Sequence, residues 1–177
     1  MELTREMRRE YVQHFKSCQV MANRTKEVDL IVKKIEDNKG RYEAVTKLTG
    51  VPWFVIAVIH NMESGLSFEK HLANGDPLTA RTKQVPKGLP KEGNPPFSFE
   101  EAAVAALKHE GFDKISSWSL AEILFCLERF NGLGYRTKNI PTPYLWAASN
   151  HYQKGFVKHP PLKGQASCDR RFAFAHR

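Results

Sequence analysis

The chain has 177 residues, of which 41% are hydrophobic and 26% are charged. These values are ordinary for a soluble globular protein, and they exclude a disordered chain and a small domain that depends on disulfides. The formal net charge is +8 and the pI is near 9.5. Such a charge favours an anionic partner, which leaves nucleic acid, an anionic membrane surface and the acidic polymers of a bacterial wall.

The cysteines and the N-terminus bear on the compartment. Cys18, Cys126 and Cys168 are widely spaced and odd in number, without a CxxC pair, so we expect synthesis in a reducing compartment. The charged N-terminus is followed by no apolar segment, and no secretory signal is expected. The longest apolar run, 51–59, is too short to cross a bilayer, so no membrane insertion is expected.

The first forty residues have a helical pattern. Apolar residues recur every three or four positions from Leu3 to Ile35, which predicts one long helix or two helices broken near Asn23. Asn38-Lys39-Gly40 is predicted to end it with a left-handed cap. We therefore expect a helical extension over 1–39 and a main domain over 40–177.

A buried helix is predicted from Pro52 to Glu63. A shorter helix through Tyr42 precedes it and closes at Gly50. Proline suits the first turn of a helix, where its missing N–H costs nothing. The segment from Pro52 to Glu63 is apolar on nearly all sides until its last turn, so it should be the central helix of the core.

A segment rich in glycine and proline follows, from Asn74 to Pro96. The stretch from Leu78 to Val85 is predicted to form short strands, giving a small β-hairpin lobe. Helices then resume, with capping patterns that begin at Ser98, Ser119 and Thr142. The predicted class is α+β and mainly α.

Glu63 is the candidate general acid. It lies where the apolar helix ends, in Ile59-His60-Asn61-Met62-Glu63-Ser64-Gly65. Desolvation disfavours a charged carboxylate, so partial burial should raise the pKa of Glu63 and keep it protonated near neutral pH. A glutamate at a helix end is more often simply solvated, and the context must decide.

Asp76 supplies that context, thirteen residues later, in the turn Asn74-Gly75-Asp76-Pro77. A carboxylate on a turn is wetter and should stay ionised. Two carboxyl groups in opposed environments are the usual apparatus for hydrolysing a glycoside. Taken singly, Asp76 is better explained as a residue that organises the turn through its side chain.

These residues resemble the lysozyme superfamily. Glu63-Ser64-Gly65 after a buried helix, with Phe130-Asn131-Gly132 further on, is similar to goose-type lysozymes and soluble lytic transglycosylases. The resemblance is closer to lysozyme-like proteins of bacteria and their phages, and it covers roughly 42–156. It rests on elements in the same order: Val51-Pro52-Trp53, Glu63-Ser64, His71 to Thr82, Pro95-Pro96-Phe97, Glu128 to Tyr135, and Pro143 to Tyr152.

The resemblance implies a lysozyme-like fold with a cleft between the helical body and the hairpin. Glu63 would protonate the oxygen between N-acetylmuramic acid and N-acetylglucosamine, and Asp76 would activate water. The domain over 40–177 would then be the catalytic domain of a peptidoglycan hydrolase (muramidase), such as a phage endolysin. A monomer without cofactor is expected, reaching the wall after holin-type release, lysis or another export route.

The resemblance also indicates substrate-binding candidates. Most of them also have an ordinary structural explanation: a helix cap for Asn131, core packing for the tyrosines, and solvated hairpin side chains for Arg81 and Thr82. Phe130 stands where tyrosine is usual in the family. The candidates are Asn74, Arg81, Thr82, Asn131, Tyr135 and Tyr144.

Other classes of function remain as alternatives. A lytic transglycosylase, which yields 1,6-anhydromuramic products, has the same acid but no second catalytic carboxylate. A catalytically silent wall-binding or phage structural protein would not need Glu63. No metal is expected, because the seven histidines include no HExxH spacing. Nucleic acid is not the expected partner, because no helix-turn-helix or aromatic RNA-binding signature is present.

Overall fold

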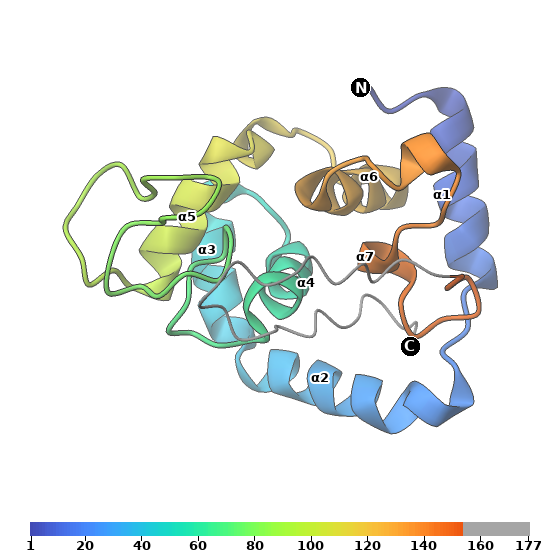
Figure 1. The fold of residues 1–177 in the computed structure, drawn as a ribbon, viewed down its shortest axis with the longest axis horizontal. Helices are drawn as coiled ribbons and strands as arrows, with labels where there is room; N and C mark the ends of the chain where they lie inside the picture. The colour runs from blue at the N-terminus through green and yellow to red at the C-terminus, as the bar shows by residue number, and fades with distance from the viewer. Residues whose placement is uncertain (154–177) are drawn as a thin grey trace. The chain divides into compact units, whose positions relative to one another are not determined.

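The computed structural model describes residues 1–153, and these are mainly helical as predicted (Figure 1). Cys168 and the last part of the predicted main domain lie outside the described residues. The described part contains isolated β-bridges, Val20 with Ser149 and Lys70 with Pro77, and no longer strand. The α-helices are α1 (Arg5–Ser17), α2 (Thr25–Asp37), α3 (Lys39–Thr49), α4 (Trp53–Ser64), α5 (Phe99–His109), α6 (Leu120–Asn131) and α7 (Pro143–Trp146).

The described chain divides into two compact units. One contains residues 1–28 with 120–153, and the other contains residues 29–119. The sequence pattern instead suggested an extension over 1–39 and a catalytic domain over 40–177. Compactness does not test which residues carry an activity, so that functional division stays a prediction.

In the first unit, α1 and α7 both pack against α6. Tyr11 on α1 is almost fully buried, as are Leu124 and Leu127 on α6. The Met21 N–H donates to the Ala148 carbonyl at 2.8 Å. The N-terminal helix α1 is therefore part of a hydrophobic core.

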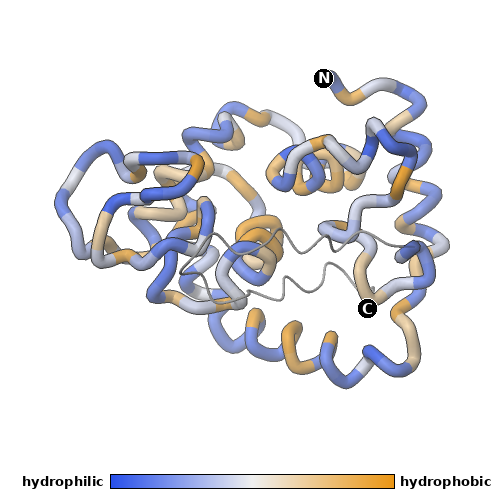
Figure 2. Tube along the Cα trace, in the orientation of Figure 1, coloured by the Kyte–Doolittle hydropathy of each residue, from blue (hydrophilic) through white to orange (hydrophobic). Residues whose placement is uncertain are grey.

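In the second unit, α3 packs against both α4 and α5. Tyr42 and Val45 on α3 are fully buried. The helix α4 is hydrophobic nearly all round (Figure 2), and all its residues from Val55 to Ser64 are buried. The predicted central helix is confirmed, and its final turn carries Glu63 into the interior of this unit.

Several predicted caps are confirmed. Gly50 closes α3 with φ of 72°, in the left-handed region. Ser98 and Glu101 form the predicted capping box at the start of α5. The Thr142 hydroxyl accepts the Tyr144 N–H at 3.3 Å at the start of α7. Each of these caps is formed by residues close together in the sequence, which is why the ends of these helices could be predicted from local patterns.

The predicted cap at Asn38-Lys39-Gly40 is wrong. Asn38 has φ of −112° and is not left-handed, and α3 begins directly after it, at Lys39. The Asn38 side chain donates to the Lys34 carbonyl at 2.9 Å, which satisfies the end of α2. Glycine tolerates a left-handed conformation but does not require one, and Gly40 is a residue of the helix.

The strands expected between Leu78 and Val85 are not formed, so the β-hairpin is replaced by long loops between α4 and α5 (Figure 1). Pro77 and Pro86 flank the segment on either side, and proline lacks the N–H donor that a strand ladder needs. Side chains take up backbone groups instead: the Thr82 hydroxyl accepts the Leu89 N–H at 2.9 Å. The lobe expected beside the helices is therefore a loop structure held by side chains.

Candidate active site

Glu63 is next to the last residue of α4, and only 8% of its surface is exposed. Gly65 caps the helix in the left-handed region, with φ of 62°, and the following Leu66 also has a positive φ, of 60°. A left-handed conformation is unfavourable for leucine and persists only where surrounding contacts impose it. The turn after Glu63 is therefore tightly determined by its surroundings.

The loop that carries Asp76 comes directly against the end of α4. Gly75 has φ of +76°, and a Cβ atom at this position would lie 2.6 Å from the backbone oxygen of Glu63. Only glycine fits such an approach. The backbone of the Asn74-Gly75-Asp76 turn thus contacts the backbone of Glu63, and both belong to the same unit.

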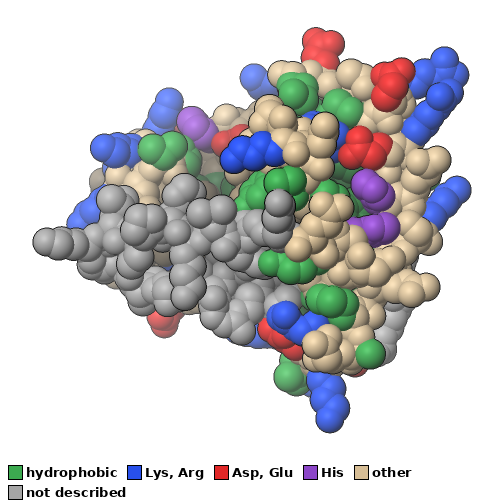
Figure 3. All heavy atoms as spheres, turned by 45° about the vertical axis from the view of Figure 1, so that its right-hand side comes forward, with side chains coloured by type: hydrophobic (Ala, Val, Ile, Leu, Met, Phe, Trp, Pro, Cys, Tyr) green, Lys and Arg blue, Asp and Glu red, His purple; other side chains and the backbone are tan. Residues whose placement is uncertain are grey.

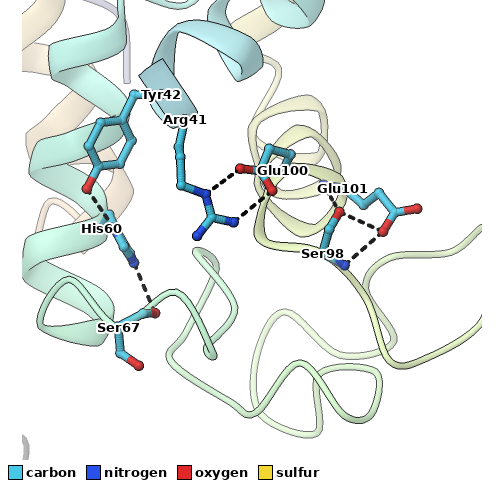
Figure 4. Close-up of polar contacts among 7 residues, drawn as sticks. All are labelled: Arg41, Tyr42, His60, Ser67, Ser98, Glu100 and Glu101. Carbon is cyan, nitrogen blue, oxygen red and sulfur yellow. Dashed lines mark hydrogen bonds and ion pairs between the residues drawn. The ribbon is translucent and has the colours of Figure 1, made fainter. Parts of the chain in front are cut away.

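His60, one turn before Glu63, fixes the turn that follows the helix (Figure 4). Its Nε2 lies 3.0 Å from the Ser67 carbonyl oxygen, and its Nδ1 lies 3.0 Å from the Tyr42 hydroxyl. Because a carbonyl only accepts, Nε2 carries the proton and Nδ1 accepts from Tyr42. The ring therefore holds the chain just beyond Glu63 from inside the core.

Burial makes His60 a neutral side chain. His60 is fully buried, and this burial lowers the pKa of its imidazole from 6.5 to about 4. The Ser67 carbonyl opposes that shift, whereas the charges of Lys34 and Arg41 add to it. No role was predicted for His60 from the sequence. Its position three residues before Glu63 on a buried helix was the signal of a positioning role.

Asp76 organises its own loop. Its Oδ2 accepts the backbone N–H groups of Lys83 and Gln84 at 2.8 and 3.0 Å, and the Asn74 amide at 3.1 Å. Its Oδ1 accepts one long bond, 3.4 Å, from the Gln84 amide. Oδ2 is therefore occupied by the loop, whereas Oδ1 retains lone pairs that can accept a proton.

The other candidates of this unit also hold the loop. The Asn74 amide group donates to Asp76 and to the Gln84 carbonyl at 3.1 Å. Arg81 donates to the Gly93 carbonyl at 2.6 Å, and Thr82 is buried. The structure brings these side chains together with Asp76 as a loop framework, so contact with a ligand is not needed to explain them.

The remaining candidates belong to the other unit. Asn131 is the last residue of α6 and is half-buried. Tyr135 is half-buried and precedes a short 3₁₀ turn. Tyr144, on α7, is only 2% exposed, as expected for an aromatic side chain that packs in a core. These three residues and Glu63 therefore belong to different units of the chain.

A second buried carboxylate, Glu128, was not a candidate in the sequence. It is 2% exposed, and it accepts a hydrogen bond from the Tyr11 hydroxyl and another, at 2.8 Å, from Arg136. Burial raises the pKa of Tyr11, and the bond to Glu128 adds to this. Arg136 also pairs with Glu10 at 3.1 Å. This paired carboxylate links α1 to α6 and is a structural group.

No protein-family model matches the chain, and neither a curated protein nor a solved structure matches it significantly. No three or more His, Cys, Asp or Glu side chains among residues 1–153 are grouped so that they could hold a metal ion. No single helix of the described chain is long and apolar enough to span a membrane; α3 and α4 meet that test only as a pair bent by 115°. Lys and Arg side chains are spread over the face in Figure 3, with Asp and Glu among them.

Proposed function

We propose that this protein is a peptidoglycan glycosidase in which Glu63 is the general acid. The observation that carries the proposal is the burial of Glu63 at the end of an apolar helix. Only 8% of this residue is exposed. A general acid at a glycosidic oxygen must hold its proton near neutral pH, and burial disfavours the charged form of a carboxyl group. The fixed turn around His60 and Gly75 supports a defined position for this residue.

The proposed substrate is the β-1,4 bond between N-acetylmuramic acid and N-acetylglucosamine. It rests on the ordered likeness to the lysozyme-like proteins of bacteria and phages, which includes Glu63-Ser64 and the stretch from His71 to Thr82. The fold we propose is a lysozyme-like one in which loops take the place of the hairpin. Such an enzyme would act as a monomer on the wall after release from the cell.

Hydrolysis is the first candidate for the second half of the reaction. Asp76 supports it through Oδ1, the oxygen that accepts one long bond and can take a proton from water. The glycosidic bond would break as Glu63 donates its proton to the leaving oxygen and water adds to the muramic carbon. The products of this muramidase would each end in an ordinary sugar.

A lytic transglycosylase is the second candidate, and it is favoured by the hydrogen bonds that the other oxygen of Asp76, Oδ2, accepts from its own loop. The bonds from Lys83, Gln84 and Asn74 to its Oδ2 account for this carboxylate as a loop residue. Without a second catalytic carboxylate, Glu63 would first protonate the leaving oxygen and so become ionised. The muramic 6-hydroxyl would then bond to the muramic C1 and give its proton to Glu63, which closes a 1,6-anhydro ring. Each anhydro product is lighter by one water than its hydrolytic counterpart.

The test is incubation of purified sacculi with the wild type and the Glu63→Gln variant, followed by mass analysis of the released fragments. We expect fragments from the wild type and about a thousandfold fewer from the variant, because loss of general acid catalysis costs about 10²–10⁴-fold. Glu69→Gln is the matched control, since Glu69 is an exposed carboxylate nearby in the chain. Equal release by wild type and Glu63→Gln would refute the proposal, and absence of release by either would favour a silent wall-binding protein.

A further inference from the structure

The loop over residues 82–93, which we term the basic loop, has a fixed shape without regular secondary structure. The Thr82 hydroxyl donates to the Pro86 carbonyl at 2.5 Å and accepts the Leu89 N–H at 2.9 Å. Asp76 accepts two backbone N–H groups of the loop, at 2.8 and 3.0 Å. The loop backbone is therefore ordered before any partner binds, which lowers the entropy cost of binding.

The basic loop exposes positive charge and one apolar side chain. Lys83, Lys87 and Lys91 are exposed, and none of them has an ion-pair partner among the described residues. Val85, between the first two, is 83% exposed. Glu92 is the only acidic residue of the loop. Binding residues are often carried by ordered loops, and this loop exposes three ammonium groups without ion-pair partners in the described part of the chain and one apolar side chain.

We propose that the basic loop docks the peptide stems of peptidoglycan, an inference that rests on the proposed function. Peptide stems carry carboxylates beside small apolar side chains, and this chemistry is complementary to a loop that exposes both ammonium groups and a valine. The lysines would pair with stem carboxylates, and Val85 would contact stem methyl groups. The loop would thus hold the substrate through its peptides, while Glu63 acts on the glycan.

The composition of the loop favours peptide carboxylates over nucleic acid. The loop contains no aromatic residue on which a base can stack, and no arginine. Phosphate-binding surfaces are rich in arginine because its planar group donates two bonds to one phosphate. Glu92, beside Lys91, would repel a continuous phosphate chain more than a separate carboxylate.

Binding to sacculi tests the proposal directly. We would measure co-sedimentation of the full chain carrying Glu63→Gln, so that the walls stay intact, with and without the triple change Lys83→Ala, Lys87→Ala and Lys91→Ala. The control triple, Lys47→Ala, Lys108→Ala and Lys114→Ala, removes the same charge from exposed positions of the same unit. We expect the loop triple to weaken binding about tenfold, and the control triple less than about threefold, because exposed ion pairs each contribute modestly.

The source of the anion is tested with treated walls. Amidase treatment removes the peptide stems, and we expect it to abolish the difference between the loop triple and the control triple. Removal of phosphodiester-linked polymers with hydrofluoric acid should leave that difference unchanged. A difference that vanishes after hydrofluoric acid, or that appears with DNA and not with walls, would overturn the assignment to peptide stems.

Equal weakening by the two triples would also overturn it, because general electrostatic attraction would then suffice. This binding assay is separate from the release of fragments. If Glu63→Gln released as much as the wild type while the loop triple still lost binding, the proposed acid would fail and the docking loop would stand. In the opposite case, the wild type releases fragments, Glu63→Gln does not, and the loop triple binds normally. Only the proposal about the docking loop would then be refuted.

Discussion

Gly75 contacts the backbone carbonyl oxygen of Glu63 so closely that a single added methyl group would lie 2.6 Å from that oxygen. The contact joins the turn of Asp76 to the end of α4 through main-chain atoms, without a side chain between them. Because a helix end and a turn are both fixed by their own hydrogen bonds, neither can move away freely. The position of Glu63 therefore depends on the residue at position 75.

Gly75→Ala should lower both stability and activity. A non-glycine residue in the left-handed region costs about 1–2 kcal/mol, and the clash with Glu63 adds roughly 1–3 kcal/mol as overpacking does. Urea unfolding would measure the first effect and fragment release from sacculi the second. Gly88→Ala is the matched control: Gly88 has φ of +77°, and its added methyl would meet nothing within 4 Å. If the two variants were equally stable, the close contact would have no energetic weight.

Glu128→Ala should destabilise the protein by about 3–5 kcal/mol, the usual cost of breaking a buried ion pair by removing one partner. The change leaves Tyr11 without its acceptor and Arg136 without its buried partner. Glu10→Ala removes the other carboxylate that pairs with Arg136. The Glu10 side chain is 44% exposed, so this change should cost at most about 1 kcal/mol. Chemical unfolding of both variants checks this. Similar losses would mean that burial of the pair does not matter.

The helices of this chain were largely predictable because their signals are local. Apolar spacing predicted α4, and the capping box of Ser98 and Glu101 predicted the start of α5. The pair of Tyr11 and Glu128 was not predictable, because these residues are 117 positions apart. The sequence pattern around a glutamate in a helix does not reveal which distant residue it will contact once the helices pack.

The loop between α4 and α5 shows the same limit for the candidate site. The sequence indicated turns and strands there, but the loop is shaped by bonds from the Asp76 and Thr82 side chains to backbone groups. Such bonds compete with a strand ladder, and residue patterns do not reveal which of them form. The position of Glu63 at a helix end was predictable, whereas the contact with Gly75 was not.

The protein should lose stability on acidification because His60 is buried in its neutral form. The folded-state pKa is about 4, below the ordinary 6.5, so the unfolded chain binds the proton more readily. Stability is fully present above the unfolded pKa and is lost as the pH falls from about 6.5 toward 4. The loss between pH 7 and pH 5 should be about 2 kcal/mol.

Urea unfolding of the wild type and of His60→Gln at both pH values checks this prediction. The glutamine variant should be less stable at pH 7, because it loses the bonds to Tyr42 and Ser67. Its own loss between pH 7 and pH 5 should be smaller by about 2 kcal/mol, since the titrating ring is absent. Parallel pH profiles for the two proteins would assign the effect to other groups.

Substitution of Asp76 separates its structural role from a catalytic one. Asp76→Ala removes the acceptor of the Lys83 and Gln84 N–H groups. It should cost about 1–2 kcal/mol, because these exposed and partly buried N–H groups lose ordinary hydrogen bonds but can bond to water instead. Asp76→Asn keeps one oxygen as an acceptor and should cost less. Stability therefore should rank wild type above Asn and Asn above Ala.

Activity should rank differently if Asp76 is the base that activates water. The Asn variant would then be as inactive as the Ala variant, because an amide oxygen cannot take the proton. Fragment masses from sacculi decide between the mechanisms. If the wild type releases hydrolytic products and Asp76→Asn does not, the result would support the muramidase. If Asp76→Asn releases as much anhydro product as the wild type, the protein would be a transglycosylase. Asp76 would then act only by holding its loop in place.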